Sequence, residues 1–294
     1  MLHQRLNPKH SAYQKVYQDL TNRELGYQGE RSMDYHFQFL NDDFTLLHDL
    51  RIRGINQTFF QMDTVVLCPQ FIGIIEVKNL SGSIIFDEST KQMLRKTQNG
   101  VESLPNPLTQ VRRQRIQLEN FLTDQGFPGL PVKSIVVFAH PSTIIETENK
   151  SIIHSVIRAE FISEKLELLQ GNPIKTHLTF NQIQSIAKQL CQADSPDLTS
   201  IFQTYEIDRS DIRKGVYCPS CSHPLMSRQQ KNGSWYCSRC LNYSKTAHLQ
   251  ALDDFSILFD EPLTNRACRD FLQLQSRHTT YRMLKERNQM QGNG

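Results

Sequence analysis

Residues 58–79 read TFFQMDTVVLCPQFIGIIEVKN and predict two antiparallel strands joined by a short connection. Both halves of the stretch are rich in β-branched and aromatic residues, and a Cys-Pro-Gln segment separates them. Because Pro69 holds φ negative, it does not fit the first central position of a primed two-residue turn. A four-residue loop around a type I turn is therefore favoured. This loop pairs Leu67 with Ile72.

The predicted register brings charged residues together on one face of the hairpin. Counting outward from the loop sets Asp63 directly opposite Glu76, and the two-residue period of a strand adds Lys78 to the same face. Two like charges directly opposite each other destabilise a sheet unless positive charge lies between them. A divalent cation together with Lys78 supplies that charge, so the hairpin predicts a metal site. The alternative is an exposed ion pair of Glu76 with Lys78, which contributes little to stability.

The residue types indicate which metal and which chemistry to expect. Hard cations such as Mg²⁺ or Mn²⁺ prefer oxygen ligands, so Asp63, Glu76 and the main-chain carbonyl of Val77 are the expected ligands. Such a metal polarises a phosphoryl oxygen and favours formation of a hydroxide nucleophile. Lys78 would then orient or help to activate the attacking water, or stabilise charge that develops on the phosphate.

Residues 22–40 have the helical spacing of apolar side chains and include Glu30. Gly26 and Gly29 weaken this helix near its start and indicate close approach of its backbone to another element. Glu30 would serve a second metal ion or hold a water molecule beside the first. Taken alone, Glu30 is more typical of a polar surface position on an amphipathic helix.

A second helix is predicted to begin after Asn106, which suits the N-cap, with Pro107 at the first helical position. The pattern continues to about Gln125 and stops at Gly126. Gln110 lies one turn into this helix, where it would face the metal pocket and contact water or substrate. The alternative for Gln110 is an ordinary polar position on the helix.

Three arginines follow Gln110 on the same helix: Arg112, Arg113 and Arg115. Basic side chains beside a metal pocket would hold nucleic-acid phosphates without reading the base sequence. Each arginine by itself is more typical of a solvated, charged helix face.

Several further elements surround these motifs. The Asn99-Gly100 pair predicts a tight turn between two short strands, and residues 132–139 form a nearly continuous apolar run that is typical of an inner strand. Thr179 and Gln182 form a capping box for a helix that ends near Cys191. Strands are also expected at 44–50 and from 82 to 86, short elements between 152 and 169, and a linker over 193–215.

Four motifs in this order resemble the NERD (nuclease-related) domain, a branch of the PD-(D/E)xK nuclease superfamily. They are Gly26-x-x-Gly29-Glu30, Gln61-Met62-Asp63, Ile75-Glu76-Val77-Lys78-Asn79 and Asn106-Pro107-x-x-Gln110. The resemblance covers residues 21–145, and four ordered motifs are far more specific than a lone ExK triplet. Met62 departs from the pattern, in which an aliphatic residue is expected.

The resemblance implies an α/β fold in which helices flank a restriction-endonuclease-like mixed sheet. It also implies hydrolysis of phosphodiester bonds, most simply in DNA, with Glu30, Asp63, Glu76, Lys78 and Gln110 at the site. A non-catalytic module that keeps the fold and binds nucleic acid, or takes part in assembly, is the alternative.

Two CxxC pairs near the end of the chain predict a second metal site. Cys218, Cys221, Cys237 and Cys240 have the spacing of a four-cysteine zinc centre, which leaves no open position for a substrate. The segment resembles a zinc ribbon, or topoisomerase-type zinc finger, with a structural role. His223 is an alternative ligand. Such a ribbon would recruit nucleic acid or a protein partner.

The sequence also predicts roles for two aromatic neighbours of the zinc ligands and for the three other cysteines. Trp235 and Tyr236 would stack on bases of single-stranded nucleic acid or form the core of the ribbon, and the core role is favoured for Trp235. Cys68, Cys191 and Cys268 are expected to be small buried apolar residues.

Length and composition set the outer limits. A chain of 294 residues holds a full-sized core and a smaller module, and a net charge of +3 permits a nucleic-acid partner without demanding one. No stretch has the length of a membrane span, and a cytoplasmic location is expected. The expected organisation is an arm at 1–20, the nuclease-like domain at 21–145, a helical extension and linker at 146–215, the zinc ribbon at 216–245 and a basic helical segment at 246–294.

Overall fold

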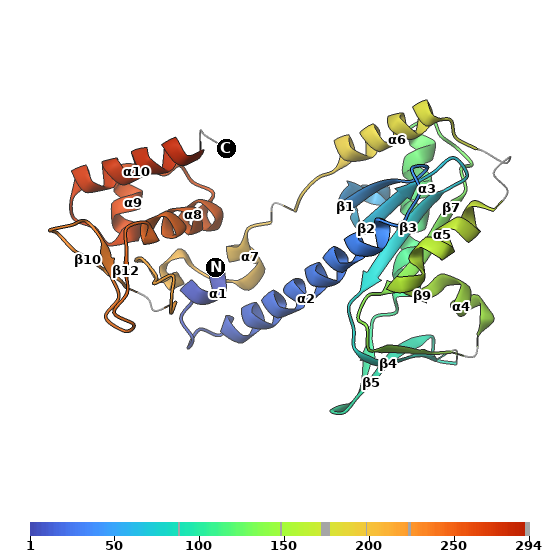
Figure 1. The fold of residues 1–294 in the computed structure, drawn as a ribbon, viewed down its shortest axis with the longest axis horizontal. Coiled ribbons are helices and arrows are strands. Elements are labelled where there is room, and N and C mark those ends of the chain that lie inside the picture. Colours follow the sequence, from blue (N-terminus) through green and yellow to red (C-terminus); the bar gives the residue numbers. More distant parts are fainter. Residues whose placement is uncertain (88, 148, 172–176, 198, 223–224, 292–294) are drawn as a thin grey trace. The chain divides into compact units, whose positions relative to one another are not determined.

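The structure is a computed structural model that describes residues 1–87, 89–147, 149–171, 177–197, 199–222 and 225–291. The chain forms two compact units, one of residues 1–21 with 199–294 and the other of residues 22–198 (Figure 1). The division falls inside the long helix α2 (Tyr13–Phe37). Among the described residues, no helix has both the length and the apolar composition that a membrane crossing requires.

The unit of residues 22–198 is built on a five-stranded mixed sheet with the order β1-β2-β3-β7-β9. The first three strands are antiparallel, whereas β3, β7 and β9 are parallel. Their bounds are β1 (Thr45–Arg53), β2 (Phe59–Leu67), β3 (Ile72–Lys78), β7 (Val132–Phe138) and β9 (Val156–Arg158). This arrangement confirms the predicted α/β class with a mixed sheet.

The central hairpin has the register that the sequence predicts near its loop. Leu67 pairs with Ile72, and the ladder continues to the pair Thr64–Ile75. It stops there, so Asp63 and Glu76 are not a ladder pair, although they are the next residues in register.

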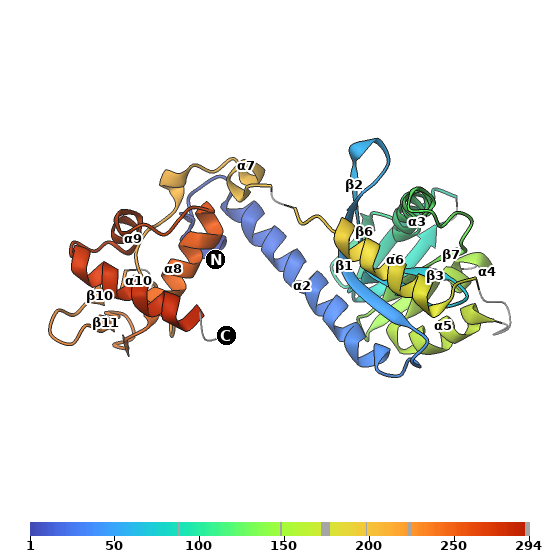
Figure 2. The same ribbon diagram turned by 90° about the horizontal axis from the view of Figure 1, so that it is seen from above.

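Helices cover both faces of this sheet. On one face, Leu118 of α3 (Pro107–Asp124) and Ile183 of α6 (Phe180–Ala193) pack on β1, β2 and β3. On the other face, Met33 of α2 and Leu166 of α5 (Ile162–Gln170) pack on β3 and β7 (Figures 1 and 2). The inner strand β7 is apolar because both of its faces are buried, with Val136 and Val137 in different clusters.

A second sheet, with the order β6-β5-β4-β8, lies beside the first. Its strands are β4 (Gly82–Asp87), β5 (Gln92–Thr97), β6 (Gly100–Leu104) and β8 (Thr143–Glu146). The β5–β6 hairpin confirms the predicted tight turn, but its two loop residues are Gln98 and Asn99, because Gly100 already pairs with Thr97. Ile84, Phe86 and Met93 form a cluster with Val111 of α3 and Phe138 of β7, so the two sheets share α3 as a support.

The helix caps also follow the sequence. The Asn106 side chain accepts a hydrogen bond from the Leu108 N–H at the start of α3, and Thr179 and Gln182 form the capping box of α6. Helix α2 begins at Tyr13, however, rather than near Asn22 as predicted. The segment expected as a helical extension contains α4 (Lys150–Ser155) and also contributes strand β9.

The other unit joins the start of the chain to its C-terminal third. Its helices are α1 (Leu2–Arg5), the beginning of α2, α7 (Ile201–Tyr205), α8 (Ala247–Phe259), α9 (Asn265–Leu272) and α10 (Arg277–Gln291), and its small sheet contains β10 (Ser227–Arg228), β11 (Trp235–Tyr236) and β12 (Tyr243–Ser244). Leu6 and Val16 share one core with Trp235 and Phe271. The first residues thus pack within this unit, whereas the sequence suggested an arm.

A buried ion pair fixes the start of the chain in this unit. The Arg5 guanidinium is buried; its Nε donates to the Asp254 carboxylate at 2.7 Å and its Nη1 donates to the carbonyls of Arg213 and Gly215. Ile207 and Ile212 are buried in the same core, so the end of the expected linker is packed. The domain boundaries drawn from the sequence stay a prediction.

Two glycines in α2 provide a matched test of the packing that holds this helix on the sheet. A Cβ at Gly29 would lie 2.5 Å from the Cβ of Asn79, whereas a Cβ at Gly26 would meet nothing within 4 Å. The close approach predicted for both glycines is therefore confirmed at Gly29 and wrong at Gly26. Asn79 also donates from Nδ2 to the Leu25 carbonyl at 2.8 Å.

We expect the same substitution to have opposite effects at these two positions. Gly26→Ala should raise the free energy of unfolding by about 0.5–1 kcal/mol, because alanine favours a helix and has space there. Gly29→Ala should lower it by about 1–3 kcal/mol, because the helix or Asn79 must shift. Urea unfolding of the two variants measures both changes, and stabilisation by both would contradict the packing described here.

Candidate active site and cysteine cluster

Strand β2 changes face at Asp63 and Thr64. Met62 and Val65 pack in the same apolar cluster, although the two-residue period of a regular strand would place them on opposite faces. The β1–β2 pairing runs on both sides of this point but skips Asp63 and its counterpart Asp49, whose φ is 53°. Asp63 is thus outside the strand ladders, and its side chain is available for another partner.

That partner is the main chain of β3. The Val77 N–H donates to Oδ2 of Asp63 at 2.8 Å. Within a strand, the N–H and the C=O of one residue point to the same edge, so the Val77 carbonyl lies on the Asp63 side of β3. The next carbonyl, of Lys78, faces the opposite edge and accepts from Ala139 N–H at 2.9 Å. The structure therefore brings the Asp63 carboxylate and the Val77 carbonyl to one place.

Glu76 is almost fully buried, with 1% of its surface exposed, and both of its oxygens accept hydrogen bonds. Lys78 Nζ lies 2.6 Å from Oε1, and Gln114 Nε2 lies 2.8 Å from Oε2. Lys78 Nζ also donates to Gln110 Oε1 at 3.2 Å. The pair of Glu76 with Lys78 is consequently part of a partly buried network that includes Gln110, and is not an exposed ion pair.

The pKa values of the acids show that negative charge accumulates here. Burial, followed by the nearby charge of Glu76, raises the pKa of the Asp63 carboxyl to about 7, although the Val77 hydrogen bond opposes this shift. Burial also raises the pKa of Glu30, with Asp49 and Glu76 as the next causes, and Lys78 acts in the opposite direction. Four acids therefore contribute negative charge at this site, and the ammonium group of Lys78 opposes the resulting rise in pKa. The acids are Glu30, Asp49, Asp63 and Glu76.

Two residues of the candidate site, Gln114 and Asp49, were not predicted from the sequence. Gln114 lies one turn beyond Gln110 on the same face of α3, and this spacing could have indicated it. Its Nε2 also donates to the Gln61 carbonyl at 2.8 Å, so it links β2 to Glu76. Asp49 could have been noticed as an aspartate inside a strand, a position that strands disfavour.

The three arginines of α3 differ in their surroundings. Arg112 and Arg113 are exposed, and neither has a carboxylate partner among the residues that the structure describes. Arg115 is half-exposed, and its Nε lies 3.6 Å from Glu119 one turn later. Their predicted role in binding nucleic acid stays a prediction.

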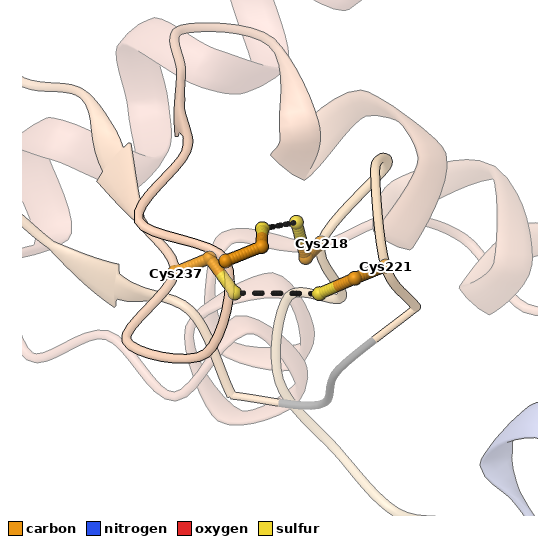
Figure 3. A group of neighbouring side chains, drawn as sticks. Cys218, Cys221 and Cys237 are labelled. Carbon is orange, nitrogen blue, oxygen red and sulfur yellow. Dashed lines mark hydrogen bonds between the residues drawn. The ribbon is translucent and has the colours of Figure 1, made fainter.

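The four cysteines form a compact cluster beside the small sheet (Figure 3). The Sγ atoms of Cys218 and Cys240 are 3.5 Å apart, those of Cys221 and Cys237 are 3.6 Å apart, and all four lie within 4.8 Å of one another. Tetrahedral Zn²⁺ with bonds of about 2.3 Å to sulfur separates its ligand atoms by about 3.8 Å. The cluster therefore has the dimensions of a four-cysteine zinc centre, whereas His223 lies outside the described residues.

The burial of Trp235 and of the three other cysteines can be compared with the predictions. Trp235 is buried in the core of this unit, which confirms its core role. Cys68 and Cys268 are buried as predicted, but Cys191 is exposed, so its predicted burial is wrong. Cys191 lies near the end of α6, on the side of the amphipathic helix that faces away from the core.

The raised pKa of Asp63 predicts how stability depends on pH in the absence of added Mg²⁺ or Mn²⁺. The folded state binds the Asp63 proton more tightly than the unfolded state, whose pKa is near 3.8, so stability falls as the pH rises from about 4 to about 7. Asp63→Asn keeps an acceptor for Val77 N–H and removes this titration. We expect the variant to gain on the order of 1–3 kcal/mol relative to wild type between pH 5 and pH 8, as measured by urea unfolding. An identical pH dependence for both proteins would contradict the assignment.

Comparison with known proteins agrees with this geometry. Residues 25–139 match the family model described as the nuclease-related domain. Searches of curated proteins and of solved structures gave no match. The matched range includes Glu30, Asp63, Glu76, Lys78 and Gln110. The chain therefore carries a nuclease-related (NERD) domain at residues 25–139, together with a four-cysteine cluster in a small antiparallel sheet that is consistent with a zinc ribbon.

Proposed function

We propose that this protein is a divalent-metal-dependent nuclease that hydrolyses phosphodiester bonds in DNA. The observation that carries the proposal is the group of buried Glu76 with partly buried Asp63 and Lys78 inside a nuclease-related domain. Buried carboxylates close to one another are costly unless positive charge offsets them, and Lys78 offsets one of them. The site thus has the charge and the oxygen donors that suit a divalent cation.

The proposed ligands are the carboxylates of Asp63 and Glu76 and the carbonyl of Val77, a set that suits Mg²⁺ or Mn²⁺. When bound, the cation polarises a phosphoryl oxygen and lowers the pKa of a coordinated water. If Glu76 Oε1 were to hold a cation, the hydrogen bond that it now accepts from Lys78 would weaken. Gln110, which accepts from Lys78 Nζ, then holds the ammonium group near the reaction centre.

The other residues have supporting roles in this proposal. Lys78 donates to the attacking water or to the phosphate oxygen on which charge develops. Gln114 fixes the orientation of Glu76 through Oε2. Glu30 retains a proton to higher pH than an ordinary glutamate, and it holds a water molecule or a second cation at the edge of the site.

One observation favours the alternative, a non-catalytic module that binds nucleic acid. Both oxygens of Glu76 already accept hydrogen bonds, from Lys78 and Gln114, so the acid is satisfied without a metal. A site of this kind would keep its shape and contact a phosphate through Lys78 alone.

Replacement of Glu76 separates the two functions. The purified protein should cleave DNA when Mg²⁺ or Mn²⁺ is added, and Glu76→Gln should reduce the rate at least about 100-fold, because a ligand and its charge are lost. Glu119→Gln makes the same chemical change on the same domain at a half-exposed position of α3 and should leave the rate unchanged. The rates are measured by gel electrophoresis of labelled DNA, with the melting temperature of each variant as a folding control.

Cleavage that persists at the wild-type rate in a folded Glu76→Gln variant would reject the proposed site. Absence of cleavage in the wild-type protein, with salt-sensitive binding of DNA, would favour the binding module.

We also propose that Cys218, Cys221, Cys237 and Cys240 bind one structural Zn²⁺. So small a sheet lacks an adequate core of its own, so the bound metal would contribute directly to folding. The cluster leaves no open coordination position, which favours a structural role over a catalytic one.

Elemental analysis of the purified protein should find about one zinc per chain. Cys237→Ser should lose the metal and destabilise the unit of residues 1–21 and 199–294, whereas Cys191→Ser, which changes an exposed cysteine outside the cluster, should retain it. A folded wild-type protein without zinc would contradict the proposal.

A further inference from the structure

A groove of about 640 Å³ lies next to the candidate active site, between the start of β2 and the first turns of α3. Phe59 and Gln61 line one side, and Gln110, Arg113 and Gln114 line the other. Gln110 and Gln114 are also the residues that contact Lys78 and Glu76. The groove is therefore continuous with the proposed catalytic centre through two side chains.

Phe59 is one of the residues that line this groove, and its aromatic ring is held in place by a neighbouring side chain. The Arg51 guanidinium lies over the ring, with Cζ 3.8 Å from the ring centroid. Arg51 is itself held, because its Nη1 donates to the Ser195 carbonyl at 2.8 Å. Phe59 is nevertheless 43% exposed, so part of its surface is free to contact a ligand. An exposed ring that is already ordered loses little entropy when a second planar group stacks on it.

The polar groups of the groove suit a nucleotide. No acidic residue is among its lining residues in the described part of the chain, whereas Arg113 adds a positive charge. Side-chain amides make up most of the remaining polar lining, and they offer donors and acceptors to the edges of a base.

One buried acceptor in the lining has no partner. The Nε2 group of Gln114 donates to two acceptors, Glu76 Oε2 and the Gln61 carbonyl, and this fixes the orientation of the amide. Its Oε1 is buried and has no donor among the described residues. If the lining of the groove opens to admit it, a donor such as the amino group of a base would satisfy this oxygen.

We propose that this groove holds one unstacked base of single-stranded nucleic acid, so that the adjoining phosphodiester lies at the candidate active site. The base stacks on Phe59, its edge meets the amides of α3, and Arg113 contacts a phosphate. Bases within a continuous duplex are paired and stacked, and cannot enter the groove without being extruded. The substrate is then a single strand or an unpaired segment. This inference deepens the proposed nuclease function and depends on it for the assignment of the substrate.

Binding without added Mg²⁺ or Mn²⁺ tests the groove separately from cleavage. The probe is a fluorescein-labelled single-stranded oligonucleotide, compared by anisotropy with a duplex of the same sequence. Phe59→Ala should weaken single-strand binding about 5- to 100-fold, the range expected for the loss of one base–aromatic stack, and should leave duplex binding unchanged. Phe180→Ala, at a phenylalanine of the same unit that is 73% exposed, should bind both probes like wild type.

A tryptophan at the same position reports stacking directly. Phe59→Trp should retain single-strand affinity, and its added fluorescence should be quenched when the oligonucleotide binds. The chain has one natural tryptophan, so the wild-type signal gives the background. Phe180→Trp should show no such quenching. Unchanged duplex binding by Phe59→Ala shows that its loss of single-strand affinity is not a failure to fold.

Unchanged single-strand affinity in Phe59→Ala, or an equal loss for both probes, would overturn the inference. The outcome is distinct from that of the proposed function. If cleavage depends on Glu76 but single-strand binding does not depend on Phe59, the proposed base-binding role of the groove is rejected and the proposed nuclease function stands. Binding that depends on Phe59, with no cleavage under any divalent cation, would reject the nuclease and leave the groove as a binding site for single strands.

Discussion

The closeness of Asp63 and Glu76 in a buried setting is the constraint on which the rest of the site depends. Burial disfavours the ionised Asp63 carboxyl, and the nearby charge of Glu76 disfavours it further, which raises the pKa of Asp63 to about 7. The fold relieves this conflict only in part, with a main-chain N–H for Asp63 and with Lys78 for Glu76. Under the function proposed here, a cation bound by these oxygen donors would offset the residual negative charge.

The surrounding elements hold this group in place by separate means. The parallel pairing of β3 with β7 fixes the main chain that carries Glu76 and Lys78, and the end of the β2–β3 ladder frees the Asp63 side chain. Close packing of Gly29 on Asn79 positions α2, and with it Glu30, at the edge of the site. Helix α3 supplies Gln110 and Gln114 from one face, and the same face borders the groove beside Phe59. Catalysis and substrate binding, as proposed here, thus share one helix.

Sequence was a good guide where local chemistry decides the structure. The period of the strands and the geometry of Pro69 gave the Leu67–Ile72 register, and the side chains of Asn106 and Thr179 marked two helix starts. It was a poor guide where distant packing decides. The reversal of β2 at Asp63 depends on β1 and β3 together, and the burial of Arg5 depends on Asp254, far along the chain. Neither constraint leaves a local pattern. The predicted burial of Cys191 was wrong for a related reason, because composition does not tell which face of a helix is covered.

The most direct test of the account is a crystal structure of the protein soaked with Mn²⁺, in which anomalous scattering locates the metal. We expect one Mn²⁺ bound by the carboxylates of Asp63 and Glu76 and by the Val77 carbonyl, with Lys78 displaced from Glu76 Oε1. Absence of manganese at this position in a crystal soaked at millimolar concentration, with the pair of Lys78 and Glu76 intact, would contradict the central claim.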